Sequence, residues 1–464
     1  NSAARGRIDR SARPMRSNER DARMKEPPKI GLDEFRRRRQ ELMALMADNS
    51  VAILPSGRMM MRNSDVDFLF RQDSNFHYLT GFGEPESVLV LIPGREHGES
   101  ILFCRERDPD LEQWHGRMTG PDRAMQLYQL DDAFPISDID DILPGLIEGR
   151  SQLYHQMGVD GGFDNRVLGW VNGLRNNRQG GAQPPGELIQ LGQYVHELRL
   201  FKSAQEVAVM KHAAKVTAQG HRRLMEIAEP GMNEHRFEVE LNYQFGLGGV
   251  RSPAYPSIVG AGVNACILHY IENNQPMAKG DLVLVDAGAE YEHYASDVTR
   301  TFPVDGRFSD AQRALYEVVL AANIAAIDKV LPGNHWNEPH EAATRVITEG
   351  LVALGILEGE VEALMEDEAF KPFYMHRTGH WLGLDVHDVG EYKVGDAWRV
   401  FEPGMVTTVE PGIYIPEDAD VPGQFRGIGI RIEDDVLVTR KGNEVITADV
   451  PKNIDDIESF MAEA

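Results

Sequence analysis

The sequence of 464 residues has few of the features that mark secreted, membrane-spanning or nucleic-acid-binding proteins. Its two cysteines, Cys104 and Cys266, allow at most one disulfide, which excludes a disulfide framework and favours a cytoplasmic protein. No stretch approaches the roughly 18 consecutive apolar residues that cross a bilayer, so no membrane partner is expected. Only 48 basic residues oppose 73 acidic ones, and a net charge of −25 repels phosphate backbones, which argues against nucleic acid as a partner.

What remains is the composition of a globular enzyme with more than one domain. Residues 1–24 differ, because they are rich in arginine and contain no apolar segment; we expect a disordered leader or one added by cloning, with a native start at Met24. Residues 25–198 alternate short apolar runs with helical stretches and predict an N-terminal α/β domain. Residues 199–464 predict a second domain. Gly, Pro, Gln and Asn are concentrated in Asn176–Glu187, which is typical of a linker.

Local patterns predict several elements. Leu32–Met46 has the spacing of a helix with a basic outer face, and capping boxes at Ser203 and Ser309 predict the starts of two more helices. Short apolar runs bounded by turn residues predict buried strands at Ser50–Pro55, Ser87–Pro93 and Ser100–Cys104.

The second half of the chain contains a repeated pattern. GDLVLVDAG at Gly280–Gly288 and GMVTTVEPG at Gly404–Gly412 each combine a β-forming run with an acid and a glycine. Each is followed by a second strand-like run with an acid, Asp297 in the first copy and Glu433 in the second. These matches predict two copies of one helix–strand–strand unit, each supplying one acid from each of two strands.

The repeated acids point to bound cations. A hairpin turning about Tyr291-Glu292 places Asp286 opposite Asp297, with Cβ atoms ~5 Å apart, and like charges in that arrangement destabilise a sheet. Any one acid at a strand end is normally ion-paired or solvated, but four at repeat-related positions indicate a metal site. Oxygen ligands favour hard cations. Four carboxylates carry four negative charges, so two divalent ions fit better than one.

A histidine cluster lies just before the second carboxylate-bearing strand. His376, His380 and His387 fall within MHRTGHWLGLDVHDVG, at Met375–Gly390. A single histidine beside apolar residues is usually a hydrogen-bonded core residue, whereas three this close indicate a site with ligand and proton-handling roles. An imidazole among the ligands shifts the metal toward Mn, Co, Fe or Zn.

The chain strongly resembles the aminopeptidase P (Xaa-Pro aminopeptidase) family of pita-bread metallopeptidases. The resemblance extends over nearly everything after the leader. The motifs that carry it are QDSNFHYLTGF (72–82), VHELRLFKS (195–203), CILHYIEN (266–273), GDLVLVDAG (280–288), DVTRTFPV (297–304), HWLGLDVHDVG (380–390), TVEPG (408–412) and RGIGIRIEDD (426–435).

The resemblance implies a creatinase-like N-terminal domain, a pita-bread catalytic domain and a set of site residues. It implies five metal ligands, Asp286, Asp297, His380, Glu410 and Glu433, which in this family usually hold two Mn²⁺ ions. His269, His376 and His387 match histidines that line the substrate pocket, Arg431 matches an arginine beside the metals, and Trp114 resembles a tryptophan supplied by a neighbouring subunit. One departure is Arg377-Thr378, where relatives tend to carry smaller or less charged residues.

The implied reaction is release of the N-terminal residue from peptides with proline in second position, by attack of a hydroxide that bridges the metals. Glu410 takes the proton from the nucleophile, and the proline nitrogen is protonated either by Glu410 or by a histidine. A homodimer or homotetramer is expected. The alternatives are a prolidase acting on Xaa-Pro dipeptides, with phosphotriester hydrolysis as a side activity, and a non-catalytic peptide-binding pita-bread module.

Overall fold

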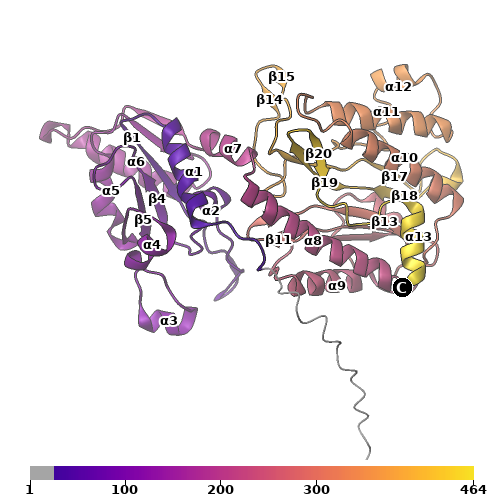
Figure 1. Cartoon of the computed structure of the whole chain (residues 1–464), viewed down its shortest axis with the longest axis horizontal. Coiled ribbons are helices and arrows are strands. Elements are labelled where there is room, and N and C mark those ends of the chain that lie inside the picture. Colours follow the sequence, from indigo (N-terminus) through magenta and orange to yellow (C-terminus); the bar gives the residue numbers. More distant parts are fainter. Residues whose placement is uncertain (1–25) are drawn as a thin grey trace, which may run out of the picture.

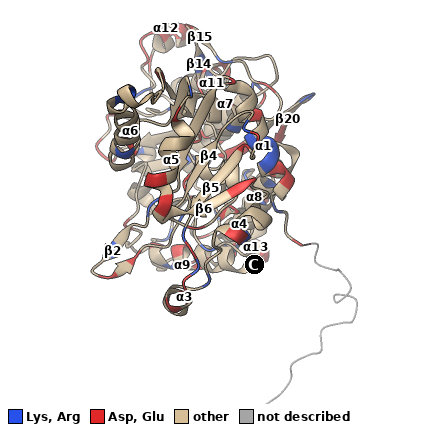
Figure 2. Ribbon diagram, turned by 90° about the vertical axis from the view of Figure 1, so that its left-hand side faces the viewer, with Lys and Arg blue, Asp and Glu red and all other residues tan. Residues whose placement is uncertain are grey.

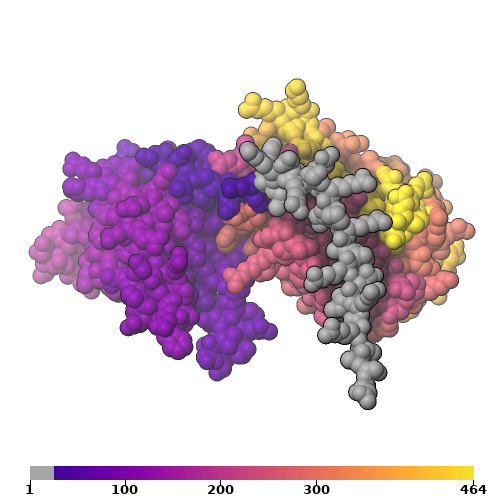
Figure 3. All heavy atoms as spheres, turned by 60° about the horizontal axis from the view of Figure 1, so that its bottom comes forward, coloured from indigo at the N-terminus to yellow at the C-terminus, as the bar shows by residue number. Residues whose placement is uncertain are grey.

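A computed structural model describes residues 26–464, so the leader expected at residues 1–24 lies outside the described residues. Figure 1 shows two α/β domains side by side along the longest axis, the first in indigo to magenta and the second in rose to yellow. The space-filling view in Figure 3 shows the same two bodies meeting. None of the helices within residues 26–464 is long and apolar enough to cross a bilayer.

The first domain is built on a six-stranded mixed sheet with the order β6-β5-β4-β1-β7-β8. Strand β4 is antiparallel to β1 and β5, and the remaining neighbours are parallel. The central strands are continuous apolar runs because helices cover both faces of the sheet. The bounds are Ser50–Pro55 (β1), Val88–Leu91 (β4), Ser100–Cys104 (β5), Asp132–Pro135 (β6), Gln152–His155 (β7) and Glu187–Gln190 (β8).

Helices pack around this sheet, and two small elements extend away from it. One is α3 (Pro109–His115), which projects below the rest of the domain in Figure 1. The other is the hairpin of β2 (Met61–Asn63) and β3 (Val66–Asp67). The other helices are α1 (Leu32–Leu45), α2 (Ser74–Thr80), α4 (Pro121–Tyr128), α5 (Ile139–Ile147), α6 (Gly161–Asn176) and α7 (Gly192–Leu200).

Two details of this domain differ from the sequence-based expectations. The Gly- and Pro-rich segment Asn176–Glu187 is not the link between domains, because β8 follows it and pairs with β7 in the same sheet. The arginine run of helix α1 is blue in Figure 2, and of its four residues only Arg36 and Arg37 are exposed. Arg38 and Arg39 are buried and donate to backbone carbonyls, among them those of Tyr78 and Leu79. Four consecutive residues span a whole helical turn, so they cannot share one outer face.

The second domain contains the expected repeat. Each copy has two packed helices followed by an antiparallel strand pair, α8 and α9 before β10 and β13, then α10 and α11 before β16 and β19. Both capping boxes form as expected, at Ser203 and Ser309. The helices are α8 (Ala204–Ile227), α9 (Glu234–Leu247), α10 (Asp310–Ile327), α11 (Glu338–Ala353), α12 (Val361–Glu366) and α13 (Ile454–Glu463).

The strands of this domain form two three-stranded sheets and several two-stranded pairs. The three-stranded sheets have the orders β13-β10-β9 and β16-β19-β20. The bounds are Ile258–Ala261 (β9), Leu282–Asp286 (β10), Glu290–Tyr291 (β11), Tyr294–Ala295 (β12), Thr299–Pro303 (β13), Lys393–Val394 (β14), Ala397–Trp398 (β15), Val406–Val409 (β16), Gly412–Ile415 (β17), Ile428–Arg431 (β18), Asp434–Thr439 (β19) and Gly442–Val445 (β20).

The register of the first hairpin is shifted from the expected one. Asp286 pairs with Thr299, not with Asp297, because the chain turns at Glu292-His293, one residue later than expected. Both turn residues have positive φ, 48° and 68°, which is the backbone of a tight two-residue hairpin turn. The shift in pairing is two residues, so Asp297 stays on the same face of the sheet as Asp286.

Polar contacts join the two domains. Arg71, beside α2, forms an ion pair with Glu290 on β11 at 2.7 Å. The Ser74 hydroxyl donates to Asp385 at 2.6 Å, and Asp385 also accepts from Arg199 of α7 at 2.7 Å. The first domain is thereby attached to the loop of the second domain that contains the histidine cluster.

Candidate metal centre

Two buried aspartates lie on one face of the first hairpin. Asp286 is the last residue of β10 and Asp297 lies two residues before β13, with exposed fractions of 9% and 5%. The Tyr255 hydroxyl lies 2.6 Å from Oδ1 of Asp286 and also contacts Oδ1 of Asp297. A hydroxyl has one proton and can donate to only one carboxylate at a time. The other carboxylate therefore needs a proton or a cation of its own.

The second copy of the repeat contributes two glutamates. Glu410 directly follows β16 and Glu433 directly precedes β19. The Glu410 backbone N–H donates to the Thr378 carbonyl at 2.8 Å, and the Glu433 carboxylate accepts from the Thr299 hydroxyl at 2.7 Å. Thr299 belongs to β13 of the first copy, so the acids of the two copies meet where the two halves pack together.

His380 is held between the two pairs of acids. A Cβ at the preceding Gly379 would lie 2.1 Å from the Thr408 carbonyl oxygen, so only glycine lets this loop approach β16 so closely. The His380 ring places Nδ1 3.0 Å from the Trp381 carbonyl, to which it donates. That bond directs Nε2 toward the acids, 3.5 Å from Oδ2 of Asp297 and 3.6 Å from Oε1 of Glu410, where it can bind a metal once it has lost its proton.

All five ligands implied by the resemblance line one cavity of about 380 Å³. Within it, Asp297, His380 and Glu433 each offer a ligand atom, and these atoms lie within 4.8 Å of one another. The structure thus brings together carboxylates from four separate segments and one imidazole from a fifth.

Burial and mutual repulsion shift the pKa values of these side chains. Burial raises the pKa of Glu410 to about 7, against the opposing charges of His380 and Arg431. Burial, reinforced by nearby carboxylates, holds the pKa of Glu433 well above its usual range. Burial also opposes the ionisation of Asp297, but the hydrogen bond and charge of His380, together with Tyr255 and Arg431, outweigh it and lower its pKa. For His380, burial disfavours the charge, yet Asp297 and Glu410 raise its pKa to about 9.

These residues fit a site for divalent metal. The four carboxylates outnumber the two arginines, Arg377 and Arg431, that line the cavity, so a divalent cation bound among them would offset their negative charge. The donor set, rich in oxygen with a single imidazole, suits Mn, Co, Fe or Zn. The Tyr255 hydroxyl and the Thr299 hydroxyl hold the carboxylates from outside, as is usual for metal ligands.

The other residues expected in the pocket surround this cluster. His269, His376, His387 and Arg431 all line the cavity. Arg431 is 3% exposed and donates to Asp286 at 2.6 Å and to the Tyr414 hydroxyl at 3.0 Å. His376 has Nε2 2.9 Å from that same hydroxyl, and the His387 ring packs edge-on against His380 with centroids 4.3 Å apart.

Trp114 is not part of this cavity. It lies on α3 of the first domain and is 82% exposed. The structure describes a single chain, so a role for this side chain in the site of a second copy stays a prediction.

Sequence reasoning missed several residues that hold the ligands in place. Tyr255 and Tyr414 carry no charge and belong to no recurring pattern, so nothing in the sequence marks them. Asp388, in contrast, lies inside the histidine-rich motif and is buried between Arg199 and Lys202 of the VHELRLFKS motif. An acid beside apolar residues in one motif and two cations in another are a signal from which a buried ion pair between the two motifs could have been predicted.

Comparison with known proteins gives matches over both domains. The family model "Metallopeptidase family M24" matches residues 208–440, and "Aminopeptidase P, N-terminal domain" matches residues 35–154. The chain is 46% identical to the Xaa-Pro aminopeptidase of Escherichia coli, with 94% of this chain and 99% of that protein covered. It is 34% identical to human Xaa-Pro aminopeptidase 3, with 94% and 87% covered.

Solved structures agree with this match. The structure of Pseudomonas aeruginosa aminopeptidase PepP superposes with a TM-score of 0.93 at 58% identity, covering 94% of this chain and 99% of that one. Zinc-substituted E. coli aminopeptidase P in complex with product has a TM-score of 0.92 at 45% identity, covering 94% and 99%.

Proposed function

The chain belongs to metallopeptidase family M24, and on this basis we propose that it is an aminopeptidase that releases the N-terminal residue from peptides with proline in second position. The observation that carries the proposal is the convergence of a complete five-residue ligand set, three histidines and Arg431 in one cavity. A non-catalytic peptide-binding module does not need this ligand set. The E. coli relative, matched over 99% of its length, is named for this activity.

We propose that Asp286, Asp297, His380, Glu410 and Glu433 hold two divalent ions, normally Mn²⁺, with Zn, Co or Fe as substitutes. Two ions would offset the four carboxylate charges, and the single imidazole suits these metals. When bound, the ions supply Lewis acidity that lowers the pKa of a water molecule and polarises the scissile carbonyl.

The chain's own residues then divide the remaining tasks. Glu410, which lies among the ligands and lines the cavity, accepts a proton from the attacking water. His387 or His376 is proposed to donate to the oxygen that becomes negative, and His387 is the better placed of the two, because Nδ1 of His376 donates to the Arg377 carbonyl and its Nε2 faces the Tyr414 hydroxyl. His269 holds the substrate. Arg431, paired with Asp286, fixes that carboxylate. The acidic cavity also attracts the free α-ammonium group of the peptide.

Proline in second position suits this type of site. The Xaa–Pro bond is a tertiary amide with no N–H, so a peptidase that holds the scissile amide through that donor cannot use it. Here recognition acts through the carbonyl and the N-terminal ammonium group, neither of which is altered by proline.

We further propose that Trp114 completes the site of a second copy in a homodimer or homotetramer. Trp114 is 82% exposed, and the β2–β3 region on the same domain exposes Met60, Met61 and Phe68 by more than half. Large apolar side chains gathered on a surface mark interaction sites. A reducing, cytoplasmic location, expected from the sequence, stays a prediction.

The test is hydrolysis of three peptides by the chain supplied with Mn²⁺. We expect release of the first residue from Ala-Pro-Ala, little or none from Ala-Ala-Ala, and slower cleavage of the dipeptide Ala-Pro. The matched control is Glu410→Gln, whose turnover should fall by orders of magnitude in a folded protein. Cleavage of Ala-Pro alone would instead favour a prolidase, and no cleavage of either proline peptide would refute the proposal.

A further inference from the structure

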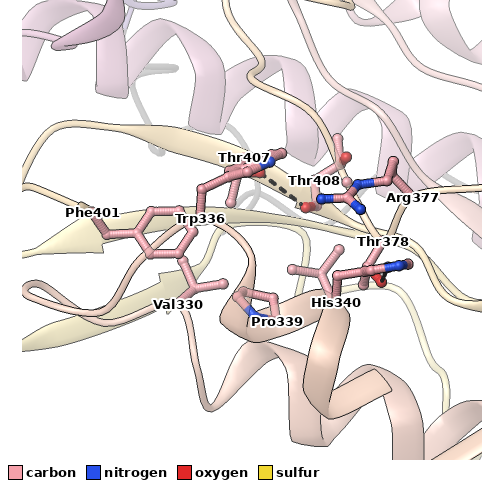
Figure 4. Close-up of a pocket in the computed structure, with 11 residues that line it drawn as sticks. Val330, Trp336, Pro339, His340, Arg377, Thr378, Phe401, Thr407 and Thr408 are labelled. Carbon is pink, nitrogen blue, oxygen red and sulfur yellow. Dashed lines mark hydrogen bonds between the residues drawn. The ribbon is translucent and has the colours of Figure 1, made fainter. Parts of the chain in front are cut away.

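Arg377 lies on the border of the catalytic cavity, directly after His376 and three residues before His380. It lines the cavity that contains the acids, and together with Gly379 it also lines a smaller neighbouring cavity. Figure 4 shows its side chain reaching across that smaller cavity, from the same loop as Thr378. The side chain is exposed, so a group leaving the catalytic cavity on this side meets the guanidinium.

The guanidinium of Arg377 is held in place but has no acidic partner within residues 26–464. Its one hydrogen bond among residues 26–464 goes to the neutral Asn337 side chain, and its Cζ lies 5.2 Å from the ring centroid of Trp398. Arg431, the other arginine of the cavity, has all three nitrogens engaged, with Thr299, Tyr414 and Asp286 as partners. An arginine has five N–H donors, so most of those on Arg377 remain available to a ligand.

The cavity therefore has a polarity that matches one class of peptide. Its interior is acidic and receives the substrate's α-ammonium group, while its border has an uncommitted cation. We propose that Arg377 is a specificity-determining residue that binds a carboxylate of the substrate on the far side of the scissile bond. This inference rests on the proposed Xaa-Pro activity and adds the substrate class, namely peptides with a negative charge at or soon after the proline.

Two substrate groups supply that chemistry. One is the C-terminal carboxylate of a short peptide, and the other is an acidic side chain in the third position. Either group lies within two residues of the scissile carbonyl. Because an extended chain advances ~3.3–3.6 Å per residue, the carboxylate is only a short distance beyond the bond that is cut. A planar guanidinium held by Asn337 and Trp398 suits a carboxylate, with which it forms two parallel hydrogen bonds.

The test compares wild type and Arg377→Gln, both supplied with Mn²⁺, on four peptides. The first pair is Ala-Pro-Ala with a free C-terminus and its C-terminal amide. The second pair is Ala-Pro-Glu-amide and Ala-Pro-Gln-amide. Loss of a charged hydrogen bond at an accessible site is expected to raise KM by about tenfold for the substrates that carry the bound carboxylate. KM for the neutral amides and kcat for all four should stay within about twofold. The pair that responds identifies the source of the carboxylate.

Two further variants separate a specific contact from general charge. Lys393→Gln removes another cation stacked on Trp398, 4.4 Å from its centroid, that does not line the cavity, and it should leave all four KM values unchanged. Arg377→Lys, unlike Arg377→Gln, should keep part of the preference for peptides that carry the bound carboxylate. Equal loss on all four peptides, no loss on any, or the same loss in Lys393→Gln would overturn the role of Arg377. Failure of wild type to cleave any of the four would instead overturn the proposed function.

Discussion

The buried carboxylate of Asp388 lies 3.0 Å from the Lys202 ammonium group, and both side chains are 1% exposed. The other carboxylate oxygen accepts from Arg199, which also donates to Asn75 of α2 at 2.7 Å. Asp388 directly follows His387 of the catalytic cavity. The segment that leads from the first domain into the second therefore also fixes the loop on which this histidine lies.

We expect Asp388→Asn to lower the free energy of unfolding by about 3 kcal/mol, because it leaves Lys202 buried without its partner. The matched control is Asp385→Asn. Asp385 contacts the same Arg199 but is 39% exposed, so its loss should cost about 1 kcal/mol or less. Urea unfolding measures both. An equal loss of unfolding free energy in both variants would show that the buried Asp388–Lys202 pair stabilises the fold no more than the exposed Asp385–Arg199 pair.

The difference in free energy of unfolding between wild type and Asp388→Asn should depend on pH in a direction that the pKa of Asp388 determines. Burial alone would raise the pKa of Asp388, but the charges of Lys202 and Arg199 outweigh it and lower the pKa. The stabilisation is therefore complete above the unfolded value of about 3.9 and is lost as pH falls through the lowered folded value. The gap between wild type and Asp388→Asn should narrow below about pH 4, and a gap that widens there would contradict the assignment.

Tyr255→Phe should weaken metal binding about 10- to 100-fold without unfolding the chain, because it removes the hydroxyl that contacts both Asp286 and Asp297. Metal titration against a competing chelator measures the affinity. Tyr243→Phe, at a tyrosine that is 59% exposed, is the control and should bind as wild type does. Unchanged metal affinity in Tyr255→Phe would show that this hydroxyl does not support the metal ligands.

Metal binding should release protons near neutral pH. In the metal-free site, burial opposes a charge on His380, but Asp297 and Glu410 raise its pKa to about 9. Burial raises that of Glu410 to about 7. Both groups bind metal only when deprotonated, so affinity should fall as pH is lowered. Calorimetry in buffers of different ionisation enthalpy counts the protons, and a count of zero at pH 7 would contradict these ligand assignments.

Trp114→Ala should raise KM with little effect on stability, since the side chain is 82% exposed. If a second copy uses this tryptophan, mixing Trp114→Ala with the inactive Glu410→Gln should restore part of the activity. Mixed oligomers would contain sites with both side chains intact. No recovery after verified subunit exchange would show that each chain uses its own Trp114 or none.

The sequence predicted those parts of the fold and site that depend on local patterns. The strands Ser50–Pro55 and Ser100–Cys104 and the caps at Ser203 and Ser309 form as expected, because apolar runs and capping boxes act within a few residues. The hairpin turn at Glu292-His293 was misplaced by one residue, since neither residue is a glycine or asparagine that marks positive φ. Side-chain alternation nevertheless kept Asp286 and Asp297 on one face.

Features that depend on distant contacts were not predictable from one sequence. The burial of Arg38 and Arg39 depends on carbonyls 40 and more residues away. The edge strand β8 is recognised only through its pairing with β7, so the loop before it was taken for a linker. Tyr255 reaches Asp286 and Asp297 across 31 and 42 residues, and no local pattern announces such a contact.

The most direct measurement is a titration of the chelator-treated chain with Mn²⁺, following bound metal and hydrolysis of Ala-Pro-Ala together. We expect no activity without metal, activity that rises with binding, and saturation at two ions per chain. Replacement of Glu433 by Ala should reduce the bound metal and abolish turnover. Full hydrolysis after complete removal of metal, or no metal bound at saturation, would contradict the central claim that these five side chains form a catalytic metal centre.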